Sequence, residues 1–176
     1  MAAIETSLDM EEEKVLLNIS IGLDTFEVEK TIMVNASKLF KNITENDRST
    51  TTIELVLPSN ISDQKQTMMS MLEFVQYHSE HPSAPITKPL VSDNLLESGV
   101  CEWDNQFISK SDQELVNLSL IANYMDIPDL LALCCSKIGA IMKNIIKQYK
   151  TKDEQMAAVK ARWKGTQQVG AATMAK

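Results

Sequence analysis

The chain is poor in aromatic side chains, glycine and cysteine, and has no long apolar run. Aromatic residues make up only 5% of its 176 residues, and ten methionines help to supply the missing apolar volume. No segment approaches the roughly 20 apolar residues that a membrane helix needs. The N-terminal residues show neither a basic flank nor a hydrophobic run, so no secretory signal is visible. These absences predict a soluble protein of the cytoplasm and nucleus.

Cysteine is limited to Cys101, Cys134 and Cys135. An odd number with two adjacent members makes a poor disulfide framework. Cys134 and Cys135 fall inside an apolar helical pattern, where free cysteine packs as a small hydrophobe. Reduced thiols in a reducing compartment fit this distribution.

Motifs for catalysis and metal binding are also scarce. His78 and His81 form an H-x-x-H pattern, but zinc wants four N or S ligands and no cysteine pair at ligand spacing accompanies them. The five glycines form neither a phosphate-binding loop nor a G-x-S-x-G elbow. An Asp/Glu site stays open at this point. We predict a protein without enzymatic activity, with no cofactor and no metal.

The net charge of −7 is unevenly distributed along the chain. After Ser136 come nine cations against only Asp153 and Glu154, whereas the earlier part is strongly acidic and includes the cluster Glu11–Glu13. Such a split can mark a nucleic-acid-binding tail. Here the cations have helical spacing and no interleaved aromatics, which favours a solvated helix face and makes nucleic acid an unlikely partner.

Alternating apolar residues predict a small sheet near the N-terminus. Residues 15–21 alternate as in a half-buried strand, Gly22 marks a turn, and residues 26–28 restart the alternation as a hairpin. Residues 53–57 predict a third strand. Between the hairpin and this strand, Asn35 is expected to cap a short helix. That helix would carry an apolar face of Ala36, Leu39, Phe40 and Ile43.

Two longer helices and a linker follow. Ser62 or Asp63 is expected to begin a helix with an apolar stripe, and the prolines of residues 82–91 exclude regular helix there. A short turn ended by Gly99 is expected within the linker. A capping box, Ser111–Glu114, predicts a helix whose apolar residues cover most of its circumference, as in the centre of a core.

Asp126 is expected to cap the next helix, with Pro128 in its first turn. This helix would show a long apolar stripe. Beyond Lys150 the periodicity weakens to Met156, Val159 and Trp163, before a tail of small residues. If the stripe is exposed, it marks a partner site and would promote self-association of the unpartnered chain. The members of the stripe are Leu131, Cys135, Ile138, Met142 and Ile145.

The order strand–strand–helix–strand–helix, followed by further helices, predicts an α+β fold. In this class helices cover one face of a small sheet.

Several of these segments carry a resemblance to a known family. The pair Trp103-Asp104, then Phe107, and later the run Asn123-Tyr124-x-Asp126-Ile127 occur at consistent spacing. They resemble the S-phase kinase-associated (Skp) adaptors, which read roughly Val-Trp-Asp-Gln-Glu-Phe and Leu-Ala-Ala-Asn-Tyr-Leu-Asp-Ile. Leu55-Val-Leu-Pro58 and Phe74-Val-Gln-Tyr77 are weaker matches.

The resemblance spans about residues 15–143 and has clear departures. An apolar, proline-containing segment, residues 82–100, replaces the family's acidic loop. Pro128-Asp129 stands where the family has Lys-Gly. The family's acidic C-terminal ending, with a Thr-Pro-Glu-Glu run and a final Gln-Trp-Cys, is missing. The likeness therefore describes a divergent member.

The resemblance implies a BTB/POZ-type fold, a small sheet covered by helices, with additional C-terminal helices. On this basis we expect an acidic N-terminal extension at 1–13 and a BTB/POZ module at 14–110, with its proline-containing linker at 82–100. F-box-binding helices at 111–164 and a disordered tail at 165–176 complete the chain.

The implied function is that of an adaptor in SCF ubiquitin ligases, bridging a cullin to F-box proteins in protein ubiquitination. The resemblance places cullin binding at Asn123 and Tyr124, whose polar side chains on an apolar helix should reach a surface. It places F-box binding at Trp103, Phe107, Leu131, Cys135, Ile138 and Met142.

Alternative interpretations stay open for these residues and for the protein as a whole. Trp103 and Phe107 could be core residues, and Asn123-Tyr124 could make a satisfied buried hydrogen bond. For the whole protein, one alternative is a non-ligase scaffold, for example of a kinetochore assembly, using the same F-box-binding surface. Another is a BTB-type homodimer with a nucleic-acid accessory role through its basic C-terminal region.

Overall fold

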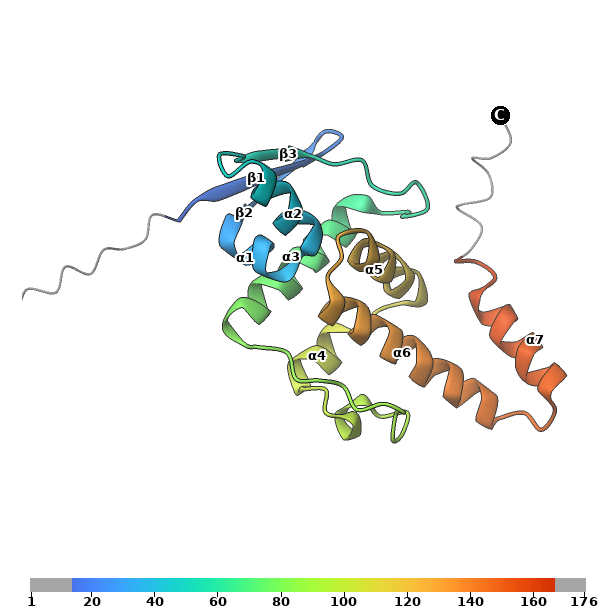
Figure 1. The fold of residues 1–176 in the computed structure, drawn as a ribbon. Helices are drawn as coiled ribbons and strands as arrows, with labels where there is room; N and C mark the ends of the chain where they lie inside the picture. The colour runs from blue at the N-terminus through green and yellow to red at the C-terminus, as the bar shows by residue number, and fades with distance from the viewer. Residues whose placement is uncertain (1–13, 167–176) are drawn as a thin grey trace, which may run out of the picture.

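A computed structural model of the chain describes residues 14–166. The predicted extension at 1–13 and most of the predicted tail, residues 167–176, lie outside the described residues. The order of elements is a small sheet interleaved with helices and then a helical half, which confirms the α+β class (Figure 1). In chain order they are β1 (Leu16–Ile21), β2 (Asp24–Glu29), α1 (Lys30–Ala36), α2 (Lys38–Asn46), β3 (Thr52–Glu54), α3 (Gln64–Glu80), the 3-10 turn η1 (Leu95–Ser98), α4 (Glu102–Phe107), α5 (Asp112–Tyr124), α6 (Pro128–Lys147) and α7 (Lys152–Trp163).

The sheet has the order β2-β1-β3. β1 pairs antiparallel with β2, placing Leu17 opposite Val28, and parallel with β3, placing Ile19 opposite Ile53. The hairpin turns at Gly22, where φ is +59°, a conformation that glycine adopts without strain. The alternating burial of β1 shows that one face of the sheet packs on the core while the other stays solvated.

The predicted helix capped by Asn35 is wrong in its start, because two helices occupy this stretch. α1 already begins at Lys30 and includes Asn35. Ser37 then leaves the helical conformation, and its hydroxyl accepts a hydrogen bond from the Phe40 backbone N–H to cap α2. The same hydroxyl donates to the Met125 carbonyl oxygen, so a distant part of the chain determines where the break falls.

α3 begins after Asp63, whose carboxylate caps it by accepting from the Gln66 N–H at 3.0 Å. Its predicted apolar stripe is buried, and η1 ends at Gly99 with φ +92°, as predicted. The capping box of Ser111 and Glu114 at the start of α5 is confirmed. α5 packs against both α3 and α6 and buries four apolar side chains in the core: Leu115, Leu118, Ile121 and Ala122.

Asp126 does not cap α6, contrary to the prediction. It adopts the left-handed conformation, φ +51°, and ends α5 in a Schellman motif. In this motif the Ile127 N–H donates to the Ala122 carbonyl oxygen and the Asp126 N–H to that of Asn123. Ile127 is then the cap of α6 and makes no side-chain capping bond. Pro128 occupies the first turn of α6, as predicted.

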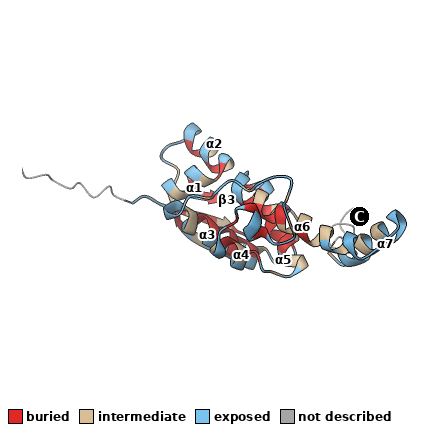
Figure 2. Ribbon diagram, turned by 90° about the horizontal axis from the view of Figure 1, so that it is seen from below, coloured by how far each residue is buried: buried red, intermediate tan, exposed pale blue. Residues whose placement is uncertain are grey.

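α7 folds back along α6 at one end of the molecule, far from the sheet (Figure 1). A second capping box, formed by Thr151 and Glu154, begins this helix. Near its end Trp163 is buried, and the Arg162 guanidinium donates two hydrogen bonds, 2.8 and 2.9 Å, to the Asp112 carboxylate at the start of α5. Most other side chains of α7 are exposed (Figure 2).

Candidate partner-binding surfaces

An aromatic column joins α3 to α4. The ring of Trp103 stacks on Tyr77 with centroids 3.7 Å apart and planes 3° from parallel. Phe107 stacks on Trp103 at 5.0 Å, and His81 stacks on Tyr77 at 4.4 Å. The Lys110 ammonium lies 4.7 Å from the centre of the Phe107 ring, within cation–π range. Trp103 and Phe107 are therefore half-buried against their own chain, and their predicted contact with an F-box stays a prediction.

A nearly buried polar pair lies beside this column. His78 Nε2 is 2.8 Å from Asp104 Oδ1, and the two side chains are only 10% and 11% exposed. His78 Nδ1 lies 2.6 Å from the His81 carbonyl oxygen. Because each element contributes one member, this pair ties the end of α3 to the first turn of α4. The Trp103-Asp104 pair thus lies in the short helix α4, and its aspartate points inward.

Ser83, His78 and Asp104 superficially form a nucleophile–base–orienter set, which the sequence pattern did not predict. The Ser83 hydroxyl oxygen is 3.1 Å from His78 Nδ1. The His81 carbonyl oxygen lies closer to the same nitrogen, at 2.6 Å, so Nδ1 faces two oxygens rather than Ser83 alone. These contacts join the end of α3, the loop that follows it and α4. The arrangement is a structural clamp.

Burial also suppresses the reactivity of two other titratable groups. Burial raises the pKa of the Tyr77 phenol, and the neighbouring Cys101 and Asp104 act in the same direction. Burial likewise raises the pKa of the Cys134 thiol to about 12, with Cys135 a smaller contributor. Since the thiolate is the nucleophile, Cys134 behaves as a core hydrophobe.

α6 presents two different apolar faces. The inner face is buried in the core and carries Leu130, Leu133, Cys134 and Ala140. The predicted F-box stripe is displaced around the helix from this face. Within the stripe Leu131, Ile138, Met142 and Ile145 are half-buried and Cys135 is exposed.

The α6–α7 hairpin carries exposed apolar side chains, of which the sequence periodicity singled out only Met156. Ile146 is 42%, Tyr149 41% and Met156 57% exposed. The hairpin itself is closed by the Gln155 side chain, which donates to the backbone carbonyl oxygens of Tyr149 and Ile146.

Asn123 and Tyr124, the predicted cullin-binding residues, lie on the last turn of α5, and both are exposed. This rules out the alternative of a satisfied buried hydrogen bond. Lys38, at the start of α2, holds the turn that follows them. Its backbone N–H donates to the Asp126 carbonyl oxygen at 3.1 Å, and its ammonium lies 3.7 Å from the Asp126 carboxylate. The surface is thus presented on a well-anchored corner.

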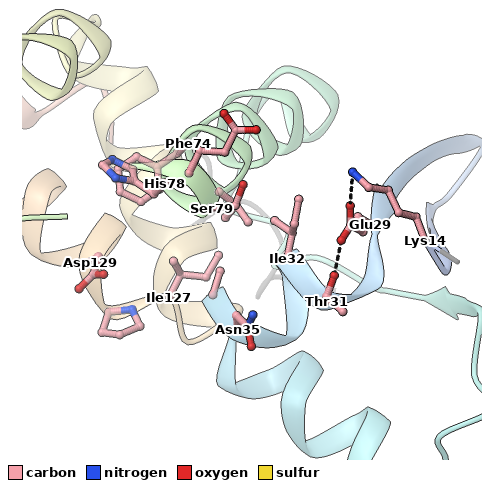
Figure 3. A pocket seen from close by; sticks show the side chains of 14 residues that line it. Lys14, Glu29, Thr31, Ile32, Asn35, Phe74, His78, Ser79, Ile127 and Asp129 are labelled. Carbon is pink, nitrogen blue, oxygen red and sulfur yellow. Dashed lines mark hydrogen bonds and ion pairs between the residues drawn. The ribbon is translucent and has the colours of Figure 1, made fainter. Parts of the chain in front are cut away.

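A groove between α1, the C-terminal half of α3 and the start of α6 was not predicted from the sequence. Figure 3 shows Ile32 and Asn35 of α1, Phe74 and Ser79 of α3, and Ile127 facing it. Its volume is about 520 Å³. We call it the α1–α3–α6 groove.

An ion pair forms one rim of this groove. The Glu29 carboxylate lies 3.2 Å from the Lys14 ammonium and accepts a hydrogen bond from the Thr31 hydroxyl at 2.5 Å (Figure 3). The Thr31 hydroxyl, followed by Lys14, lowers the pKa of this carboxyl. The Glu29 carboxylate is therefore already paired with other residues at the rim of the groove.

Among residues 14–166, no group of three or more His, Cys, Asp or Glu side chains is placed to hold a metal ion. No helix in the same range is long and apolar enough to cross a membrane.

The chain is similar to known proteins over most of its length, although no family model matches it. It is 32% identical over 148 residues to a protein of Tetrahymena thermophila called S-phase kinase-associated protein 1 homolog, a match covering 84% of this chain and 81% of that protein. It is 26% identical over 134 residues to SKP1-like protein 9 of Arabidopsis thaliana, covering 76% of this chain and 78% of that protein.

Among solved structures, the BTB domain of human gigaxonin aligns with a TM-score of 0.42 and 17% identity, covering 68% of this chain and 73% of that domain. The extent and identity of the Tetrahymena match establish the family. The chain belongs to the SKP1-like family of non-enzymatic adaptor proteins.

Proposed function

We propose that the chain is the adaptor subunit of an SCF-type cullin ubiquitin ligase and bridges a cullin to F-box substrate receptors. The observation that carries this proposal is the 32% identity to an S-phase kinase-associated protein 1 homolog over 84% of the chain. The exposure of Asn123 and Tyr124, in the last turn of α5, supports a partner site at the corner between α5 and α6.

The proposed mechanism is positional. Asn123 and Tyr124 lie at one end of the α5–α6 hairpin, and Ile138 and Met142 lie further along α6. At a rise of about 1.5 Å per residue, the 10 residues from Pro128, at the start of α6, to Ile138 correspond to roughly 15 Å along that helix. Two partners held at this spacing by one packed unit experience a high effective concentration of each other.

The rigidity of the linkage comes from the corner itself. The Schellman motif closes α5, and the Ser37 hydroxyl and the Lys38 N–H bind successive carbonyl oxygens, those of Met125 and Asp126. Met125 and Ile127 are buried. A movement of the cullin-side surface relative to α6 would break these contacts, so the two proposed sites move as one body.

Mass spectrometry of proteins that co-purify with the tagged full chain tests this proposal. We expect both a cullin and F-box proteins. Ile138→Asp should lose the F-box proteins and keep the cullin, and the double variant N123A/Y124A should do the reverse. Recovery of F-box proteins without any cullin would favour the non-ligase scaffold. Recovery of neither would overturn the proposal.

A further inference from the structure

The α1–α3–α6 groove is acidic. Three carboxylates, Glu29, Glu80 and Asp129, line it together with one lysine, Lys14. Lys14 is paired with Glu29. Glu80 and Asp129 are exposed and take part in no ion pair among the described residues. The groove therefore offers two carboxylates to a cationic occupant.

The groove also has an apolar side. Phe74, Val75 and Ile127 are buried wall residues, and Ile32 and Ala36 of α1 are half-buried. A fully solvated cation would leave this surface uncovered. An occupant that matches both features carries an apolar side chain flanked by cations.

The chain itself contains such a segment in α7. Lys152, Met156, Lys160 and Lys164 follow one another at intervals of four residues and so share one face of the helix. All four are exposed, Met156 by 57%. Trp163, seven residues after Met156, lies on the same side of the helix, so Met156 stands at the edge of the side by which α7 packs on the rest of the chain. The exposed face of α7 thus has Met156 at one edge, with Lys160 and Lys164 further from the packed side, and Met adapts to irregular surfaces.

The placement of the two features excludes contact within one molecule. α1 and α3 lie towards one end of the described chain and α7 towards the other (Figures 1 and 2). α7 is also tied to α5 by the Arg162–Asp112 pair. Because they lie at opposite ends of the chain, the α1–α3–α6 groove and the exposed face of α7 are both accessible to a second copy.

We propose that the α1–α3–α6 groove receives the exposed face of α7 from a second copy of this chain, head to tail. Met156 of one copy packs against the apolar wall, and the lysines on either side of it face Glu80 and Asp129 of the other. A contact of this kind is heterologous, so each assembly keeps one free groove at one end and one free α7 at the other, and the association stays open-ended.

Such a contact is small and salt-sensitive. A groove that takes one helix face lies at the lower end of specific interface sizes. Its ion pairs are exposed and are weakened by added salt. The contact uses neither Asn123, Tyr124 nor the α6 stripe, so it can fail while the adaptor function holds, and the reverse.

Sedimentation velocity of the full chain tests the proposal. At about 100 μM protein, suited to a micromolar contact, and about 0.05 M salt, we expect a weight-average mass above the monomer's 19.7 kDa. At about 0.5 M salt the mass should return to that of the monomer. The groove variant E80K/D129N and the helix variant K160E/K164Q should each be monomeric in both buffers.

Mixing the two variants is the decisive step. The groove variant keeps an intact α7 and the helix variant keeps an intact groove, so together they should form a one-to-one dimer that cannot grow further. Restored association also shows that both variants are folded. A matched control, E45K/E27Q, makes the same change in net charge at exposed positions outside the groove and should associate like the unchanged chain.

Three outcomes would overturn the proposal: a monomeric unchanged chain at low salt, association that survives in E80K/D129N, or a mixture of the two variants that stays monomeric. The second outcome would assign self-association to another face. In that case Ile138→Asp would identify the α6 stripe as the contact.

Discussion

Asp104 lies in the first turn of helix α4, but its nearly buried side chain also links α4 to His78 of α3. It lies in the first turn of α4, where a carboxylate complements the helix dipole, yet its side chain is 11% exposed and bonds to His78. Removing one member of a nearly buried pair leaves the other without its partner, and that loss is costly.

We expect Asp104→Ala to lower the free energy of unfolding by about 3 kcal/mol, because His78 loses its acceptor in a site largely closed to water. Glu102→Ala is the matched control. It removes an exposed first-turn carboxylate from the same helix and should cost about 0.5 kcal/mol. Urea denaturation measures the free energy of unfolding of both variants. Equal midpoints would contradict a stabilising role of the His78–Asp104 pair.

Asn123 and Tyr124 provide the second residue-scale prediction. The double variant N123A/Y124A should weaken cullin binding by about 2 kcal/mol, as truncation of interface anchors does. Both side chains are exposed, so the unfolding midpoint should stay close to that of the unchanged chain. Titration with a cullin N-terminal domain gives the affinity. Unchanged affinity would reject the assignment, and an insoluble variant would mean that the side chains are structural.

At the scale of elements, α7 depends on few contacts. Its anchors are the buried Trp163 and the Arg162–Asp112 pair, and the indole Nε1 of Trp163 is buried without a hydrogen-bond partner. An unsatisfied buried donor costs about 1–3 kcal/mol, which offsets part of the gain from burying the ring. α7 is therefore a weakly held element on a well-packed body.

Trp163→Ala should release α7 without unfolding the rest. We expect backbone amides of α7 to lose their protection from hydrogen exchange, while those of α3 and α5 keep theirs, because local opening costs less than global unfolding where buried contacts are few. Met156→Ala, in the same helix but 57% exposed, should leave protection unchanged. Loss of protection in α5 as well would show that α7 belongs to the central cooperative unit.

At the scale of the whole molecule, the proposed adaptor should be stabilised by its partner. A ligand that binds only the folded state at a hundredfold excess over its Kd adds about 2.7 kcal/mol. An F-box segment should therefore raise the melting temperature of the full chain and form a one-to-one complex. Ile138→Asp should abolish the shift, since a charge would enter the half-buried stripe. A shift that persists in this variant would place the F-box contact elsewhere.

The sequence alone determined the features that depend on neighbouring residues. Alternation in residues 15–21, the capping box at Ser111 and the all-round apolar pattern of α5 are local, and the strand, the cap and the central helix all formed as predicted. The exposure of Asn123 and Tyr124 was expected because an unpaired polar group is costly to bury. Asn117 of the same helix is nevertheless buried, with hydrogen bonds to Gln113 and Ser62, so packing decided between the two alternatives.

Only the tertiary structure decided the features that join distant segments. Ser37 breaks a helix because its hydroxyl reaches Met125, and Asp126 turns left-handed while its carbonyl oxygen binds Lys38. The Asp104 clamp and the α1–α3–α6 groove likewise need elements far apart in the chain. Periodicity reports which side of one helix or strand is apolar, whereas a groove or a buried pair depends on how two or three elements pack together.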